Sequence, residues 1–531
     1  MCGWGISMDL VFALLAASFT FGLVWFARKS TRKNPALPPG PPGEPLIGHL
    51  RVIPPVKQAE TFHEWAKEYG ESYVALAIHK PNLKLSSGDV IYLKVLGKEM
   101  IVLDTVEAAQ EILEVRGAIY SCRPRFTVFE LQGWVPSLTF LKYGKQFLKH
   151  RRMLQQYFGR KEILSFDHII QEEARLLVGN LSNASPGDHL DYVHRFTLSN
   201  IMRAAFGHPV RSDDDIFVKI GLGVSHALNH SGPPGNTPVD FFPWLRHFPS
   251  WFPGTYYAYQ ALSQYKVIRE LYDVSFEFVR TGLKNKTIER CFASEKIEHL
   301  GDSEDVEEIE DIKGAVGTIF AAGEDTTFAS LCSLLMALIH HPECQQRAYD
   351  EIISVVGHDR IPDLNDRQHL PYLECVVQEL YRWHPVGPLG VPHRATKDDV
   401  YNGMFIPKGT MVISNIGGMS IDERVYFNPK AFDPTRYLPV PEGKGEPRFT
   451  AVWGFGRRIC PGRYFADMVI WNAVACILST LELLPAKGEN RKMKLPEISF
   501  SEGLISQALP FDFEVRPRSE AAKALIVQFQ A

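Results

Sequence analysis

The chain has 531 residues, of which 45% are hydrophobic and 22% charged, so it has enough apolar material for a large globular core. Its formal net charge of −4 at pH 7 gives no general basic field, which argues against nucleic acid as a partner. The eight cysteines form no CxxC pair and are too sparse for a disulfide scaffold, so a zinc framework of that type is excluded.

The first predicted element is a single transmembrane helix over residues 10–27, which are uncharged and strongly apolar. A helix of that length spans about 27 Å, close to the thickness of the hydrocarbon core of a bilayer. Basic residues follow the apolar run and none precedes it, so the positive-inside rule places the rest of the chain in the cytosol. A cleaved signal peptide is the alternative, but its basic residues would come first. Residues 1–9 are then a short lumenal N-terminus.

Residues 28–43 form a basic stop followed by a Pro/Gly-rich segment, which favours a semi-rigid hinge because it cannot form a helix or a strand ladder. No comparable linker occurs later, so residues 44–531 are predicted to form one domain.

Within that domain, residues 91–103 have the pattern of two short strands that turn at Gly97-Lys98. Apolar residues recur at helical spacing over residues 142–175 and 256–285. The acidic stretch 302–311 is interpreted as a solvated loop and the first turn of a helix, where acids complement the helix dipole. Residues 511–515 alternate like a strand. The pattern predicts a mainly α fold with small β-sheets.

Residues 312–338 form a long apolar run that would cross the whole domain as one helix of about 40 Å. Its centre carries Gly323, Asp325 and Thr326, although a mid-helix glycine is unfavourable and buried polar groups need partners. One interpretation is a packing kink. The other is a widened helix whose acid and hydroxyl face a cavity and relay protons to bound dioxygen.

Glu379 and Arg382 are three residues apart, so they share one face of a predicted helix. Alone, such a pair is usually a solvated surface contact of little energetic value. The segment 432–437 supplies a second guanidinium, Arg436, for the same carboxylate.

Cys460 lies in a segment, residues 453–462, that is rich in glycine. Flanking glycines allow the backbone to approach a flat cofactor closely because they lack a Cβ. A thiolate ligand needs amide donors, which Pro461 cannot supply and Gly462 can. Arg458 is placed to meet a carboxylate bidentately. The alternative is a structural cysteine in a tight turn.

Taken in this order and spacing, these segments resemble the cytochrome P450 superfamily, and their texture is similar to that of fungal microsomal members. The resemblance runs from the Pro/Gly hinge to the C-terminus. It implies a mainly α fold with small β-sheets behind a single transmembrane helix, anchored in the endoplasmic reticulum membrane with the catalytic domain in the cytosol. It also implies one haem b.

The resemblance assigns roles by position. Cys460 is the proximal thiolate ligand of the iron, Thr326 hydrogen-bonds the bound oxygen, and Asp325 relays protons. Glu379, Arg382 and Arg436 form a buried structural triad, in which loss of one partner leaves a buried charge unpaired. Further haem contacts are implied for Arg123, Arg151, His393, Arg458, Gly456, Gly462 and Trp453.

Three departures from the family pattern stand out. Trp453 replaces a phenylalanine seven residues before the cysteine. Phe147 replaces the tryptophan of the helical WxxxR motif, so one propionate donor is missing beside Arg151. Residues 71–88 look inserted, which indicates either an extra surface loop or a retained intron.

The function expected from the resemblance is insertion of one oxygen atom from O2 into a hydrophobic small molecule, with electrons from NADPH through a partner reductase. A natural-product intermediate of fungal secondary metabolism and a xenobiotic both fit this expectation. The alternatives are a haem-thiolate isomerase or dehydratase, which often lacks the acid–Thr pair, and a membrane haem- or lipophile-binding protein without turnover. An apolar substrate pocket is expected from side chains without charge. Its candidate residues are Phe126, Phe129, Trp134, Phe320, Val386, Leu389 and Ile505.

Overall fold

The computed structural model describes residues 35–77, 89–232, 235, 237–301, 305–487 and 493–529, with the side chains of 71–77 excepted. The predicted membrane anchor at 10–27 lies outside the described residues. So does most of the apparent insertion, of which residues 71–77 simply continue a helix. The hinge residues 35–43 form no helix, and the carbonyl of Pro39 accepts a hydrogen bond from the Tyr92 amide, 2.7 Å away.

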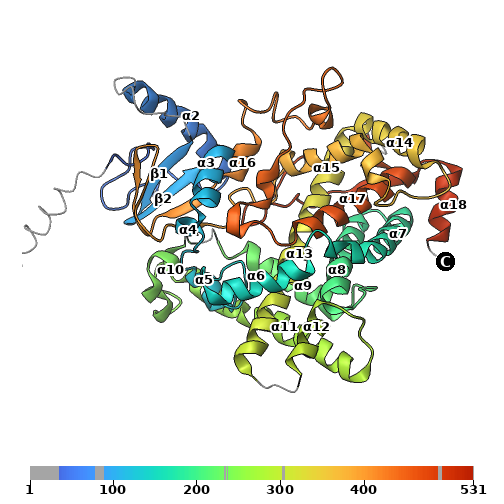
Figure 1. The fold of residues 1–531 in the computed structure, drawn as a ribbon, viewed down its shortest axis with the longest axis horizontal. Coiled ribbons are helices and arrows are strands. Elements are labelled where there is room, and N and C mark those ends of the chain that lie inside the picture. Colours follow the sequence, from blue (N-terminus) through green and yellow to red (C-terminus); the bar gives the residue numbers. More distant parts are fainter. Residues whose placement is uncertain are drawn as a thin grey trace, which may run out of the picture.

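The predicted class, mainly α with small β-sheets, is confirmed for the described residues (Figure 1). The longer helices and the short helical turns between them follow in chain order. They are α2 (Gln58–Ala77), α3 (Val106–Ala109), η1 (Gln110–Val115), α4 (Gly117–Tyr120), α5 (Thr127–Gln132), α6 (Lys145–Tyr157), η2 (Glu162–Phe166), α7 (Asp167–Asn183), α8 (His189–Phe206), α9 (Ile216–Asn229), α10 (Pro238–Phe241), η3 (Pro243–His247), α11 (Tyr256–Asn285), α12 (Phe292–Leu300), α13 (Val306–His340), α14 (Pro342–Val356), η4 (Arg367–His369), α15 (Pro371–Trp383), α16 (Ile416–Ser420), η5 (Pro434–Tyr437), η6 (Thr450–Trp453), η7 (Gly456–Arg458), α17 (Arg463–Thr480) and α18 (Glu520–Gln528).

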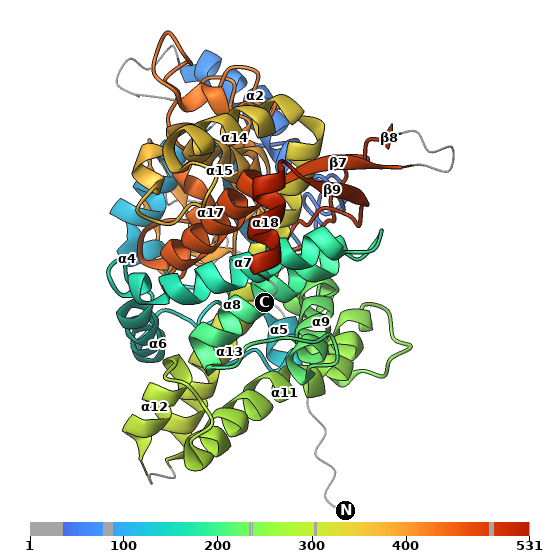
Figure 2. The same cartoon turned by 90° about the vertical axis from the view of Figure 1, so that its right-hand side faces the viewer.

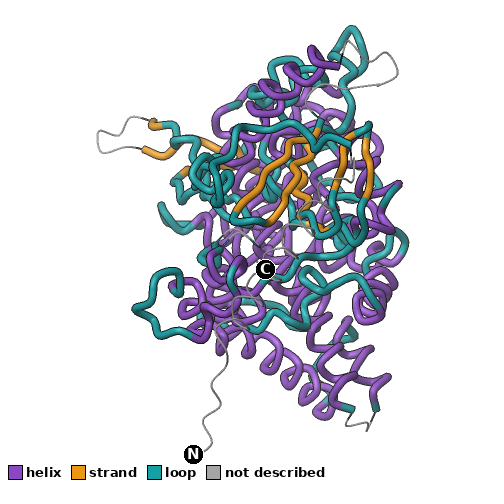
Figure 3. The backbone as a smooth tube through the Cα atoms, turned by 90° about the vertical axis from the view of Figure 1, so that its left-hand side faces the viewer, coloured by secondary structure: helices purple, strands orange, loops and turns teal. Residues whose placement is uncertain are grey.

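Three small sheets accompany the helices in the described part of the chain. Figure 3 shows most of the strands close together in the upper part of the molecule, with one strand pair apart from them at the left. The largest has the order β1-β2-β6-β3, in which β2 and β6 are parallel and the other pairs are antiparallel. The other two sheets are β4-β5 and β8-β7-β9. The strands are β1 (Val90–Val95), β2 (Lys98–Leu103), β3 (His393–Arg394), β4 (Asp399–Tyr401), β5 (Met404–Ile406), β6 (Met411–Ser414), β7 (Leu481–Lys487), β8 (Met493–Lys494) and β9 (Phe513–Pro517).

Helix α13 is the central element, and α8, α9, α11 and α17 pack around it. It begins at the N-cap Asp305, whose carboxylate accepts from the Glu307 and Glu308 amides, as the acidic stretch predicted. It is long and apolar enough to cross a membrane, but 78% of its most apolar window is buried in the protein, which makes it a core helix. Helix α18, the last described helix of the chain, lies beside α7 (Figure 2).

The other predicted elements agree with the structure to different degrees. The helix predicted over 256–285 matches α11 in both bounds. The helix predicted over 142–175 is instead two, α6 and α7, because the chain turns at Gly159, where glycine interrupts the helical pattern. The hairpin β1–β2 turns at Leu96-Gly97, one residue earlier than predicted, with φ of 47° and 83°.

Candidate active site

A cavity of about 370 Å³ lies between the centre of α13 and the segment that carries Cys460. Its wall combines apolar side chains with a group of cationic ones, and both Cys460 and Thr326 belong to it. A more open groove of about 810 Å³, between the end of α8 and α11, contains none of the predicted site residues. The first cavity is therefore the candidate active site.

The loop before Cys460 is held in a tight, specific shape. The Cys460 amide donates to the Trp453 carbonyl at 2.8 Å, and Gly454 and Gly456 adopt φ of 73° and 53°. A Cβ at Gly456 would lie 2.4 Å from the carbonyl oxygen of Leu113, so only glycine allows this approach. Gly456 does not line the cavity, which corrects its predicted cofactor contact. It fixes the loop against η1 instead.

The Cys460 side chain lies in the environment that a thiolate ligand requires. Burial raises the pKa of its thiol, while the amide of Gly462 and the positive charges of Arg151 and Arg463 lower it. The amide donor is the one expected from the sequence, because Pro461 has no N–H. A coordinating metal ion would deprotonate a thiol outright, and these donors would then stabilise its charge.

Three arginines and one histidine line the cavity: Arg123, Arg151 and His393 are buried, and Arg458 is half-buried. The pKa of each is lowered, mainly by burial, and the pKa of Arg458 falls to about 10. In the described part of the chain the three arginines bond to backbone carbonyls and pair with no carboxylate. The acceptors belong to Thr139, Val391 and Pro392 for Arg123, to Ile459 for Arg151, and to Ser121, Leu138 and Leu141 for Arg458.

Buried cations without anionic partners are costly, so a site built this way calls for an anionic ligand. Haem b meets that demand, since its two propionates can pair with guanidinium groups and Cys460 can bind its iron. The residues present therefore fit the expected cofactor.

Phe147 and Trp453, the two aromatic residues that depart from the family pattern, both pack against neighbouring side chains. Phe147 is fully buried and lies under the Arg458 guanidinium, 3.7 Å from its ring centroid. It thus holds Arg458 in place, although it cannot donate a hydrogen bond. Trp453 lines the cavity and meets the ring of Tyr381 edge-on at 5.0 Å.

The centre of α13 presents Thr326 to the cavity, where its hydroxyl donates to the Ala322 carbonyl at 2.6 Å. Asp325 does not line the cavity. It is 2% exposed and accepts a hydrogen bond from Ser225 of α9 at 2.8 Å. Burial and the neighbouring charge of Glu324 raise the pKa of Asp325 to about 7. The acid and the hydroxyl therefore point to different surroundings.

The predicted widening of the helix is not present, because α13 is α-helical at every residue from Val306 to His340. Gly323 has a packing role. A Cβ there would lie 2.6 Å from Ile201 of α8, so glycine allows the two helices to approach closely.

Comparison with known proteins agrees with this site. The family model described as Cytochrome P450 matches residues 38–515. The chain belongs to the cytochrome P450 family. Cytochrome P450 monooxygenase 136 of Postia placenta is 35% identical over 536 residues, which cover 98% of this chain and 96% of the relative. Two other relatives are 33% identical. For Cytochrome P450 monooxygenase ple1 of Rhodocybe pseudopiperita the alignment covers 97% of this chain and 95% of the relative. For Cytochrome P450 monooxygenase claR of Ampulloclitocybe clavipes it covers 93% of this chain and 89% of the relative. The protein is a monooxygenase of this family.

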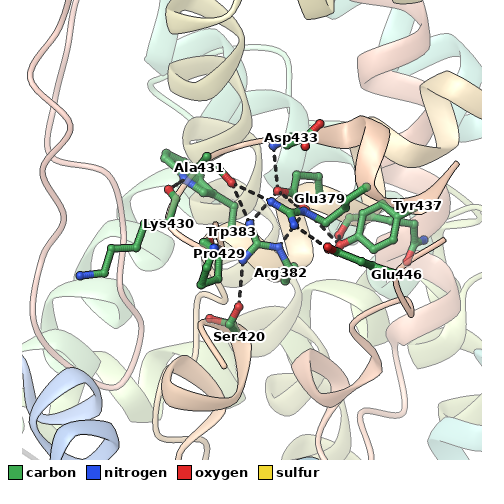
Figure 4. Close-up of polar contacts among 12 residues, drawn as sticks. Glu379, Arg382, Trp383, Ser420, Pro429, Lys430, Ala431, Asp433, Tyr437 and Glu446 are labelled. Atoms are coloured by element: carbon green, nitrogen blue, oxygen red, sulfur yellow. Dashed lines mark hydrogen bonds and ion pairs between the residues drawn. The ribbon is translucent and has the colours of Figure 1, made fainter. Parts of the chain in front are cut away.

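In this cytochrome P450 the triad is one buried network. Arg382 and Arg436 converge on the Glu379 carboxylate, with nitrogen–oxygen distances of 2.6 Å and 3.0 Å (Figure 4). All three side chains are fully buried. Arg382 also donates to the backbone carbonyls of Ser420, Pro429 and Ala431 (Figure 4).

Two members of this network were not predicted. Glu446 accepts from Arg436 at 2.6 Å, and the Tyr437 hydroxyl donates to Glu379 at 3.0 Å. Charge balance was the available signal: two buried guanidinium groups beside one carboxylate leave a positive charge that needs a second acid. The sequence did not indicate which acid that is, because Glu446 lies in an irregular loop.

The predicted pocket residues divide into two groups. Trp134, Val386 and Ile505 line the cavity, whereas Phe126, Phe129, Phe320 and Leu389 do not. Phe126 and Phe129 lie one layer behind it, packed against the cavity residue Phe140. Phe320 packs edge-on against Phe206. Leu389 packs against the hydrophobic cluster that includes buried residues of β1 and β2. For these four, the interpretation as pocket residues was wrong.

Proposed function

We propose that this monooxygenase inserts one oxygen atom from O2 into a hydrophobic small molecule, usually as a hydroxyl group, with electrons from NADPH delivered by a partner reductase. The observation that carries the proposal is that Cys460 and Thr326 line one largely apolar cavity. When bound, haem b supplies the iron chemistry that activates O2. Cys460, Arg123, Arg151, Arg458 and His393 are the residues that would hold it.

Thr326 presents a hydroxyl group to the cavity from the centre of α13. In the structure its proton is committed to the Ala322 carbonyl, so the oxygen keeps lone pairs for a second hydrogen bond on the cavity side. Asp325, behind it, can carry a proton near neutral pH because its pKa is about 7. A hydroxyl group on the cavity wall and a proton-carrying acid behind it suit the reduction of O2, which consumes protons together with electrons.

Substitution of Thr326 by alanine tests this proposal. The product formed per NADPH should fall by at least about tenfold, while substrate still binds. Ser333→Ala is the matched control, because Ser333 makes the same hydroxyl-to-carbonyl bond within α13, at 2.8 Å, away from the cavity. Equal coupling in Thr326→Ala and the wild type would remove Thr326 from the reaction, whereas a wild type that forms no NADPH-dependent product would favour an isomerase, a dehydratase or a binding protein.

The cavity wall also indicates the substrate class. Apart from the cofactor-binding cations it carries no charged side chain, which favours a neutral apolar molecule.

The electron donor and the membrane belong to the same proposal. Lys142, Lys145 and Arg457 are exposed and suit an acidic reductase surface, whereas Lys149 is engaged by Glu308 and Asp311. Residues 10–27 would anchor the chain in the endoplasmic reticulum membrane. Charge reversal at Lys145 should slow reduction by NADPH–cytochrome reductase at low salt, and a rate unchanged at any salt concentration would place docking elsewhere.

A further inference from the structure

Next to Asp325, helix α13 carries a second buried acid that the sequence pattern did not single out. Glu324 is 1% exposed, and its Oε1 lies 2.7 Å from Nε2 of His194 on α8. Both carboxylate oxygens of Glu324 and the Oδ2 of Asp325 accept no hydrogen bond from the described residues, so the contact between His194 and Glu324 is an ion pair. Two adjacent carboxylates are thus buried with free acceptor positions.

The charges around this pair are few and can be named. Glu324 and His194 act on Asp325, while Glu324, Asp325 and Asp191 act on His194. The side chains that α9 brings to this cluster are neutral. The Ser225 hydroxyl donates to Asp325, and the Asn229 amide donates to Ser225. The cation that serves both carboxylates is therefore an imidazole and not a lysine or an arginine. Unlike those, an imidazole gains and loses its proton near neutral pH.

The cluster is also ordered from the outside of the molecule toward the cavity. The His194 side chain is 13% exposed and is the most accessible member of the cluster. Glu324 and Asp325 lie deeper and are almost fully buried. Thr326, the next residue, is on the cavity wall. Burial lowers the pKa of His194, but Glu324 and Asp325 more than offset this, and the net pKa is raised.

We propose that His194 and Glu324 form the outer half of a proton relay that resupplies Asp325 from solvent. A proton taken up on one imidazole nitrogen of His194 is released from the other to Glu324, and from there it replaces the proton that Asp325 gives up toward the cavity. Nothing is oxidised or reduced in this transfer. The proposal rests on the proposed function, in which RH, O2, two protons and two electrons from NADPH give ROH and water. His194 and Glu324 act through Asp325 and are positioning residues.

The direct test is pH-difference infrared spectroscopy of the resting, haem-loaded full-length protein, which requires no turnover. The protonated carboxyl band that disappears in Asp325→Asn belongs to Asp325 and should titrate at about pH 7 in the wild type. Glu324→Gln removes a neighbouring negative charge, so this midpoint should move down by about one unit or more. His194→Gln removes the positive charge and should move it upward.

The matched control is His208→Gln, which breaks a His–Asp pair of similar length, 2.8 Å to Asp215, away from Asp325. It should leave the midpoint unchanged. In turnover, Glu324→Gln and His194→Gln should lower product per NADPH and alter its pH profile while the substrate KM stays constant. Glu324→Asp should restore part of the coupling.

A merely structural pair would give a different result. If the Asp325 midpoint stays in place in both variants while their haem and CO spectra match the wild type, His194 and Glu324 only brace α8 against α13, and the relay is refuted. Failure of the proposed function itself would appear separately, as a wild-type protein without a thiolate-type CO spectrum or without NADPH-dependent product.

Discussion

Two clusters of buried carboxylates in this molecule differ in the cations that balance them. At Glu379 two arginines, a tyrosine hydroxyl and the Asp433 amide occupy the carboxylate, and the second acid Glu446 pairs with Arg436. On α13, His194 forms an ion pair with Glu324, the Ser225 hydroxyl donates to Asp325, and three of the four carboxylate oxygens accept no hydrogen bond from the described residues.

Burial is nearly the same in both places, so the difference in partners must account for the difference in behaviour. Arginine keeps its charge at any accessible pH, so the Glu379 carboxylate has permanently charged partners. Histidine titrates, and a carboxylate that relies on it can hold a proton at neutral pH. The first cluster suits a structural role, and the second suits proton transfer.

The largest effect is expected from Glu379→Gln. Two buried guanidinium groups would then share one remaining acid, Glu446, which should destabilise the fold by about 3–5 kcal/mol. Urea denaturation followed by circular dichroism measures the change. Lys487→Ala, at the exposed ion pair with Glu514, is the control and should change little. A loss below about 1 kcal/mol in Glu379→Gln would remove the basis for calling this cluster structural.

An effect of intermediate size is expected for the pH dependence of stability. The folded pKa of Asp325, about 7, lies above its unfolded value of 3.8, so the folded state binds the proton more tightly. Stability from this group is present below pH 3.8 and is lost as the pH rises from about 4 through 7. Asp325→Asn has no carboxyl group to ionise, so it does not lose this stability as the pH rises. The Tm of Asp325→Asn minus the Tm of the wild type should therefore increase from pH 5 to pH 8. A constant Tm difference across that range would show that Asp325 stays ionised.

The smallest effect is expected from Ser225→Ala, which removes one hydrogen bond to Asp325. Stability should fall by about 1 kcal/mol, and the pKa of Asp325 should rise further, since that bond lowers it. Ser263→Ala, at an exposed serine of α11, provides the baseline. If the infrared midpoint of Asp325 falls in Ser225→Ala, the assigned contact is incorrect.

The sequence predicted best what local chemistry determines. The glycines and the cysteine around residue 460 and the i, i+3 pair at Glu379 each carry their reason within a few residues. The cations that the family resemblance singled out all line the cavity, although they come from elements far apart in the chain.

Other features depend on tertiary packing and could not be predicted. The direction of Phe320 follows from the position of Phe206, and the layer of Phe126 and Phe129 follows from Phe140. His194 meets Glu324 because α8 packs against α13, and Gly323 makes room for Ile201 in that packing. No local pattern joins residues 130 positions apart.

The CO difference spectrum of the reduced protein tests the central claim, thiolate ligation by Cys460, most directly. We predict a Soret band at the red-shifted position of thiolate-ligated haem, which Cys460→Ser removes while Cys476→Ser, a buried cysteine of α17, retains it. A wild-type spectrum without that band in folded, haem-loaded protein, or a band that survives Cys460→Ser, would contradict the account.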